Sequence, residues 1–192
     1  LSSLPVNLLL LAQLTRNFWD DIYPLMLDGE ADYRTNLFDW LSEKIVVPIR
    51  KVTIAYTLSG EIITWLDWEK ALQSEDDQSL GSGLGGKSLS SIKQAIDQTS
   101  VEYYQDFCQD LSDSLAALDY LRSVLTEQLA EEATSLTTLR ELLTSMLETI
   151  NGLTGARSSI VQEEQEQTQQ ASKEEVLGDE DSFSTESRVI NN

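Results

Sequence analysis

Apolar side chains near the start of the chain recur at steps of three and four residues, which is the spacing of an amphipathic helix. Over residues 6–27 they form one stripe: Leu8, Leu11, Thr15, Phe18, Ile22 and Leu25. Pro5 suits a first helical turn, and Pro24 is expected to kink or end the helix. Asp28-Gly29 then predicts a turn.

A second helix is predicted over about residues 33–46, limited by Pro48. Its apolar positions are expected to share one face: Leu37, Trp40, Leu41 and Ile45. The next stretch changes period. Apolar and polar residues alternate over 52–57, Ser59-Gly60 follows as a turn signal, and an apolar run begins at Ile62. This pattern predicts a small β-hairpin around 52–65, with an irregular connection as the alternative. Asp67 is then expected to cap a short helix through Leu72.

The longest helical pattern begins at Val101 and ends at Leu129. Its apolar seam keeps the three- and four-residue spacing of a helix except at Arg122. The seam consists of Val101, Tyr104, Cys108, Leu111, Leu115, Leu118, Leu125 and Leu129. A final helix is predicted after a cap at Thr134 or Ser135, with these residues on one face: Leu136, Leu139, Leu143, Met146 and Ile150. Asn151-Gly152 is typical of a helix end. The short connection between these two helices predicts an antiparallel hairpin.

Two segments have the composition of linkers. Residues 73–90 are acidic and then rich in glycine, and residues 156–192 are rich in Gln, Glu and Ser. Such segments bury too little apolar surface to offset their ordering entropy. We therefore predict an all-α domain over 1–155, with a flexible linker at 73–90, a long helical hairpin and a small β-hairpin. Residues 156–192 form an acidic polar linker or tail.

Charge and composition narrow the classes of function. The formal net charge of the 192 residues is −20, which disfavours nucleic acid and anionic membrane surfaces and favours protein partners. The sequence contains no histidine, so every histidine-dependent triad and metal site is excluded. The single Cys108 fits a buried structural thiol in a reducing compartment. The longest apolar run, Leu8–Ala12, is far shorter than a membrane span requires.

One motif matches a nucleotide-binding pattern. Residues 81–88 fit the phosphate-loop spacing through Gly81, Gly86, Lys87 and Ser88. In such a loop, backbone amides hold the phosphates, the lysine reaches the outer phosphates and the serine binds magnesium. The motif should follow a buried strand, yet the preceding residues 73–80 are polar and acidic. We interpret it as a loop, and keep a nucleotide-binding switch as an alternative.

Adjacent carboxylates occur at several places, such as Asp20-Asp21 and Glu131-Glu132. Metal binding or glycoside hydrolysis needs carboxylates that converge in one pocket. In a chain this acidic, adjacent pairs are expected on a solvated surface. We therefore expect no catalytic residue, no metal and no cofactor.

The order of these segments resembles the ImpA-related N-terminal domain of TssA-type proteins, which are components of the bacterial type VI secretion system. A Trp-Asp-x-x-x-Pro corner matches residues 19–24. The family's arginine- and leucine-containing helix is represented by Arg34, Leu37 and Leu41, which here have the spacing Arg-x-x-Leu-x-x-x-Leu. A short Asp-aromatic element matches 67–71. The long helix that carries Tyr103-Tyr104 near its start is followed by the Ser-Leu-x-x-Leu-Arg pattern of 135–140.

The resemblance covers about residues 4–153 and departs from the family at two places. The proline common before the last helix is replaced by Ala133-Thr134, and a glycine-rich stretch early in the first helix is absent. The resemblance makes a set of residues structural or interface positions: Trp19, Asp20, Tyr23, Pro24, Arg34, Leu37, Trp40, Leu41, Leu136, Leu139 and Arg140.

The resemblance also implies a function. TssA-type proteins are not enzymes; they coordinate assembly of the baseplate, the membrane complex and the tail tube and sheath. It implies a cytoplasmic location, with inner-membrane association through partners or a further segment. It also implies a full-length protein that oligomerises through a C-terminal region outside this sequence. The alternative within the binding class is a generic helical adaptor unrelated to secretion.

Overall fold

The computed structural model describes residues 1–23, 32–76, 86–129 and 136–155. Within these ranges the chain is helical apart from one antiparallel hairpin, as predicted. The helices are α1 (Leu4–Asn17), α2 (Asp32–Ile49), α3 (Trp65–Asp76), α4 (Leu89–Gln98), α5 (Val101–Leu129) and a last helix over 137–155. The strands are β1 (Thr53–Tyr56) and β2 (Ile62–Thr64). All of these elements lie within one compact unit, Leu1–Thr154, apart from Gly155 at the end of the last helix.

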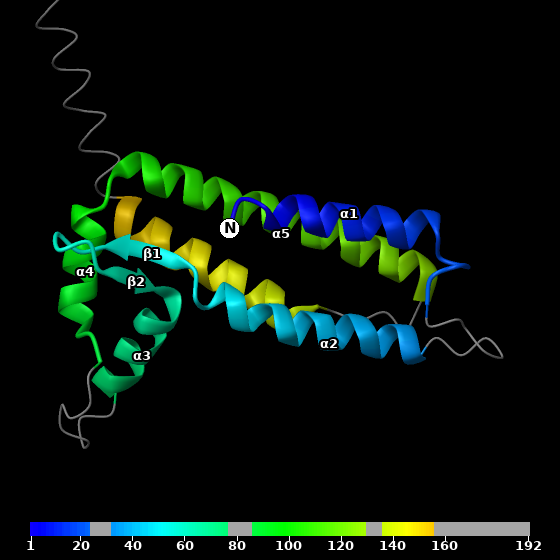
Figure 1. The fold of residues 1–192 in the computed structure, drawn as a ribbon, viewed down its shortest axis with the longest axis horizontal. Helices are drawn as coiled ribbons and strands as arrows, with labels where there is room; N and C mark the ends of the chain where they lie inside the picture. Colours follow the sequence, from blue (N-terminus) through cyan, green and yellow to red (C-terminus); the bar gives the residue numbers. More distant parts are fainter. Residues whose placement is uncertain (24–31, 77–85, 130–135, 156–192) are drawn as a thin grey trace, which may run out of the picture. The chain divides into compact units, whose positions relative to one another are not determined.

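The two longest helices run antiparallel, as the sequence predicts (Figure 1). The predicted seams of α5 and of the last helix contribute to one continuous buried core, which α1, α2, the hairpin, α3 and α4 also join. Leu111, Leu118, Leu143 and Met146 are almost completely buried within it. The last helix continues to residue 155, so Asn151-Gly152 does not end it. A Cβ added at Gly152 would meet no atom within 4 Å, so no close packing requires glycine there.

Helix α1 is shorter than the hydrophobic stripe predicted. It begins with Pro5 in its first turn, as expected, but ends at Asn17 instead of continuing to residue 27. The next residues form tight turns in which the amides of Asp21 and Ile22 donate to the carbonyl of Phe18. Because the stripe is broken there, Phe18 lies outside the core and is 53% exposed. Residues 24–31, which include Pro24 and the predicted turn at Asp28-Gly29, lie outside the described part.

Helix α2 has its predicted position but a different buried face. It extends to Ile49, with Pro48 in its last turn. The buried residues are Arg34, Phe38, Ser42, Val46 and Ile49. Leu37 and Trp40 are exposed, which contradicts the prediction that they share the core face with Leu41 and Ile45. The latter two are half-buried at the border.

The predicted hairpin is present, with β1 antiparallel to β2 and Tyr56 opposite Ile62. The register shifts between Thr53 and Ala55, so the strict alternation expected from the sequence is lost. Ile54 and Ala55 are consequently both buried. At the turn, Gly60 has φ +79°, a left-handed conformation that favours glycine.

Helix α3 begins with a reciprocal capping arrangement between Thr64 and Asp67. The Asp67 carboxylate accepts from the Thr64 amide at 2.8 Å, and the Thr64 hydroxyl accepts from the Asp67 amide at 3.3 Å. Asp67 therefore does contribute to the cap, but from the third helical position and together with Thr64. The helix runs through Asp76, so residues 73–76 of the predicted linker are helical, and α4 begins at Leu89.

Candidate functional site

The first family-like motif folds into a buried corner that joins the end of α1 to α2. The Arg34 guanidinium lies 4.5 Å from the centre of the Trp19 ring. It also donates to the carbonyls of Trp19 and Ile22, the latter at 2.8 Å. Both side chains are buried, with exposed fractions of 7% for Trp19 and 2% for Arg34. The corner is therefore a structural clamp rather than a free binding group.

The other described residues that define the motifs at 19–24 and 34–41 face solvent, apart from the half-buried Leu41. Asp20 and Tyr23 are exposed, Tyr23 at 76%. Leu37 and Trp40 are exposed on α2, and Pro24 lies outside the described residues. The structure thus separates the motif into a buried clamp and a solvent-facing apolar set, which the sequence alone did not distinguish.

The second motif is also divided between core and surface. Leu136 and Leu139 are buried in the core. Leu136 precedes the last helix with φ +49°, which is unusual for a residue with a branched side chain. Arg140 lies on the surface and forms a two-pronged ion pair with Asp119 of α5, at 3.0 and 3.1 Å. The hydrogen bond from Arg140 lowers the pKa of Asp119.

The described residues of the phosphate-loop motif have structural contacts. The Lys87 ammonium donates to the carbonyl of Ile62 at 2.6 Å and pairs with Glu61 at 3.2 Å and Asp67 at 3.6 Å. The Ser88 hydroxyl caps α4 by accepting from the Ser91 amide. These contacts attach the start of α4 to the β-hairpin and give both side chains a role without a phosphate. Gly81 lies outside the described residues.

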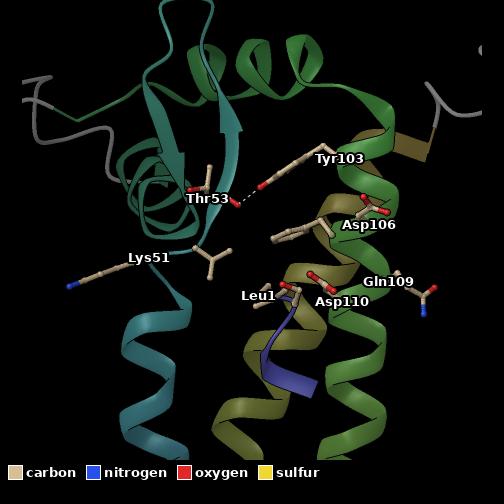
Figure 2. Close-up of a pocket in the computed structure, with 10 residues that line it drawn as sticks. Leu1, Lys51, Thr53, Tyr103, Asp106, Gln109 and Asp110 are labelled. Atoms are coloured by element: carbon tan, nitrogen blue, oxygen red, sulfur yellow. Dashed lines mark hydrogen bonds between the residues drawn. The ribbon is translucent and has the colours of Figure 1, made fainter. Parts of the chain in front are cut away.

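An open pocket of about 670 Å³ lies where the start of α5 meets the connection between α2 and β1 (Figure 2). Its walls include the aromatic rings of Tyr103 and Phe107, the carboxylates of Asp106 and Asp110, and Lys51. Figure 2 shows Tyr103 reaching across from α5, where its hydroxyl donates to the carbonyl of Thr53 at 2.7 Å. The adjacent Tyr104 donates in the same way to Ile54 at 3.0 Å.

The chemistry of this pocket suits binding better than catalysis. Burial, followed by the nearby Tyr56 and Tyr104, raises the pKa of Tyr103 to about 12. The phenol therefore stays protonated and holds its hydrogen bond to β1. Cys108, on the next turn of α5, is half-buried, and burial raises the pKa of its thiol. A protonated thiol is a poor nucleophile. Aromatic rings beside two carboxylates can instead accept a cationic side chain.

Sequence reasoning did not identify this pocket. The pair Tyr103-Tyr104 was a usable signal, because two tyrosines at the start of an apolar helix need polar partners for their hydroxyls. The partners belong to β1, about fifty residues earlier, and no local pattern indicates that contact. Within the described ranges, no group of acidic or thiol side chains is arranged to hold a metal ion. None of the described helices is long and apolar enough to cross a membrane.

Comparison with known proteins gives one informative likeness. No protein-family model and no curated protein matches the sequence. Among solved structures, the chain is similar to the N-terminal domain, including the conserved ImpA_N region, of the TssA component of the type VI secretion system from Burkholderia cenocepacia. The TM-score is 0.71 at 24% sequence identity, over 79% of this chain and 63% of that one. This likeness shows a shared fold, and the chain spans less than two thirds of the solved domain.

Proposed function

We propose that this chain is a TssA-type assembly module that docks components of a type VI secretion apparatus to one another. The observation that supports the proposal most is the shared fold with the ImpA_N region of a TssA protein, at TM-score 0.71. Residues of the motifs that resemble the family also hold the described fold of this chain together. Trp19 and Arg34 form a clamp, and Leu136 and Leu139 anchor the last helix.

Docking needs surface rather than reactive groups, and the described surface offers both apolar and acidic contacts. Large apolar side chains are exposed on α1 and α2, and the open pocket beside β1 carries two carboxylates. With a net charge of −20, the chain is suited to partners with basic surfaces. The partners we propose are components of the baseplate, the sheath and tube, or the membrane complex. The role requires no catalysis and no cofactor.

The test uses the full-length protein in a bacterium that carries it. Genes for sheath, baseplate and membrane-complex proteins are expected beside its own gene. Deleting the gene is expected to abolish assembly of a fluorescently labelled sheath, and the intact gene should restore it. A tagged copy should recover apparatus components from assembling cells. Normal sheath assembly in the deletion strain, with none of these components recovered, would contradict the proposal and favour a generic helical adaptor.

A nucleotide-binding switch predicts a different result that is simple to measure. If residues 81–88 bound a nucleotide, titration with Mg-ATP or Mg-GTP would show saturable heat that Lys87→Ala removes. We expect no saturable heat with the wild-type chain, because Lys87 already bonds to Ile62, Glu61 and Asp67. Lys93→Ala, which changes an exposed lysine on α4, is the matched control.

A further inference from the structure

The outer face of α2 carries an unusual row of exposed apolar side chains. Tyr33 is 64% exposed, Leu37 45%, Trp40 54% and Val47 54%, and Lys44 is exposed between the last two. These five residues are separated by four, three, four and three positions. That is the heptad spacing with which one helix packs along another. We call these five residues the α2 seam.

The spacing distinguishes this face from the other exposed apolar row in the described residues. On α1, Val6, Leu9, Leu10 and Leu14 are also exposed, at steps of three, one and four positions. Because each residue turns the helix by about 100°, these four side chains spread over roughly 140° of the helix surface, whereas the α2 seam spans only about 80°. Alternating steps of four and three keep the α2 seam on one side of its helix. A straight partner helix can therefore contact the whole α2 seam but only part of the α1 row.

We propose that the α2 seam docks a basic amphipathic helix of another protein. This inference rests on the docking function proposed above and adds to it the surface and the chemistry of the partner. The heptad spacing calls for apolar residues on the facing side of the partner helix. Trp40 lies in the middle of the row, where an aromatic anchor contributes most to an interface. Lys44 calls for an oxygen acceptor opposite it, which would fix the register of the two helices.

The charge of the chain decides between the possible occupants. Glu43 is exposed beside the seam, as is Asp39 one turn earlier on the same side. These two carboxylates can pair with Lys or Arg on the facing flank of a partner helix, and the net charge of −20 favours the approach of a basic partner from a distance. A second copy of the chain would bring another −20 to the contact. The chain's own residues 163–186 carry nine carboxylates against one lysine, so they are repelled as well.

The first experiment measures binding of defined probes to the full chain. The probe is a peptide of about three heptads with Leu at the apolar positions, Lys on both flanks and Gln opposite Lys44. A matched probe has Glu in place of each Lys. We expect the Lys peptide to shift backbone NMR signals along α2 and the Glu peptide to shift none. Trp40→Glu should weaken the Lys peptide about tenfold or more. Leu10→Glu adds the same charge to the α1 row and should change the affinity less than twofold.

The second experiment identifies the natural occupant. A photo-crosslinking amino acid is placed at Leu37 or Trp40 in the full-length protein in its own bacterium, with Leu10 as the control position. The two α2 positions should capture one segment whose sequence is an amphipathic helix flanked by Lys or Arg, and Trp40→Glu should abolish capture through position 37. A synthetic peptide with the sequence of that segment should bind the wild-type chain. Trp40→Glu should weaken its binding about tenfold or more, as it does for the designed Lys peptide.

Several outcomes would overturn the inference. They are crosslinks from α2 to a second copy of this chain, to its own tail, or to a segment without basic flanks, and equal effects of Trp40→Glu and Leu10→Glu. Failure of the inference is distinct from failure of the proposed function. A secretion component held through another surface leaves the function intact and refutes the seam. A basic helix from a protein unrelated to secretion supports the seam and refutes the secretion role.

Discussion

On both faces of α2, the burial of side chains is the opposite of what their hydropathy predicts. On the inner face, the charged Arg34 is 2% exposed, while on the outer face Trp40 is 54% exposed. The inner arginine is held by the Trp19 ring and by two backbone carbonyls. The outer tryptophan is not part of the buried core. The difference teaches that available contacts, more than side-chain polarity, decide which face of this helix is inside.

The physical reason lies in the corner that ends α1. The turns at residues 18–22 leave the carbonyls of Trp19 and Ile22 directed away from helical partners, and buried carbonyls need donors. Arginine offers several donors in a fixed plane that also stacks on an aromatic ring. A leucine at position 34 would bury apolar surface but leave both carbonyls without this donor. Burying Arg34 on the inner face of α2 therefore stabilises the fold more than burying the nearby Leu37 there would.

The largest expected effect follows from removing this clamp. Arg34→Ala takes away two charge-assisted hydrogen bonds and a cation–π contact, so we expect the free energy of unfolding to fall by about 3 kcal/mol or more. Arg34→Lys keeps the charge but loses the planar guanidinium, so its free energy of unfolding should lie between those of Arg34→Ala and the wild type. Urea unfolding followed by far-UV circular dichroism measures both. A loss below about 1 kcal/mol would show that the two faces of α2 do not differ in this way.

The same two faces show how far sequence could predict the fold. The seams of α5 and the last helix were predictable because each is long and its apolar residues repeat at helical spacing over many turns, with only Arg122 interrupting the seam of α5. The hairpin was predictable from its alternating pattern and the Ser59-Gly60 turn. The buried face of α2 was not. Its sequence offers two apolar rows, and the row containing Leu37 and Trp40 looks stronger than the true inner row with Arg34 and Ser42.

Contacts across long separations account for the other misses. The end of α1 depends on Arg34, which donates to carbonyls twelve and fifteen residues earlier in the chain. The pocket beside β1 depends on Tyr103 and Tyr104, whose hydroxyls donate to backbone carbonyls of β1 fifty residues earlier in the chain. Local patterns carry no information about such partners. For the same reason the sequence could nominate Trp19, Arg34 and Trp40 together but could not divide them into clamp and surface.

A smaller effect is expected from a second buried polar contact. Tyr104 is 3% exposed and donates to the carbonyl of Ile54 in β1. Tyr104→Phe keeps the ring but leaves that carbonyl without this donor, so the free energy of unfolding should fall by about 1–2 kcal/mol. Tyr103→Phe should cost less, because Tyr103 borders the open pocket where water can replace the hydroxyl. Equal losses in the two variants would show that burial of a polar contact is not what separates the inner from the outer surfaces.

Surface ion pairs should contribute less to the free energy of unfolding than these buried contacts do. They contribute only at pH values at which their carboxylates are ionised. Asp67 is partly desolvated, which raises its pKa, but hydrogen bonds from Thr64 and the charge of Lys87 outweigh this and lower it overall. The hydrogen bond from Arg140 likewise lowers the pKa of Asp119. A lowered pKa in the folded state means stability that is complete above the unfolded value near pH 4 and is lost as pH falls through the folded value.

We expect each of these carboxylates to contribute less than about 1 kcal/mol, because Asp119 is exposed and Asp67 is only partly buried, so solvent screens both. The measurement is the free energy of unfolding between about pH 5 and pH 2 for the wild type, Asp67→Asn and Asp119→Asn. Each variant should show a shallower decline than the wild type over this window, and added salt should reduce the difference. Identical slopes would mean that neither carboxylate has a lowered pKa in the folded protein.

The smallest expected effect on stability comes from the outer face of α2. Trp40→Ala and Leu37→Ala remove apolar side chains that are already 54% and 45% exposed, so little surface returns to water and no cavity forms. We expect the free energy of unfolding to change by no more than about 0.5 kcal/mol in either variant, and Tm to stay almost unchanged. Phe38→Ala is the matched control on the same helix, because Phe38 is 5% exposed and its truncation should cost about 3–5 kcal/mol. If Trp40→Ala instead cost as much as Phe38→Ala, the outer face would belong to the core and would not be available to a partner. A stable, fully folded Trp40→Ala protein that has lost its docking partner would show that the tryptophan is placed for binding, since the fold does not need it.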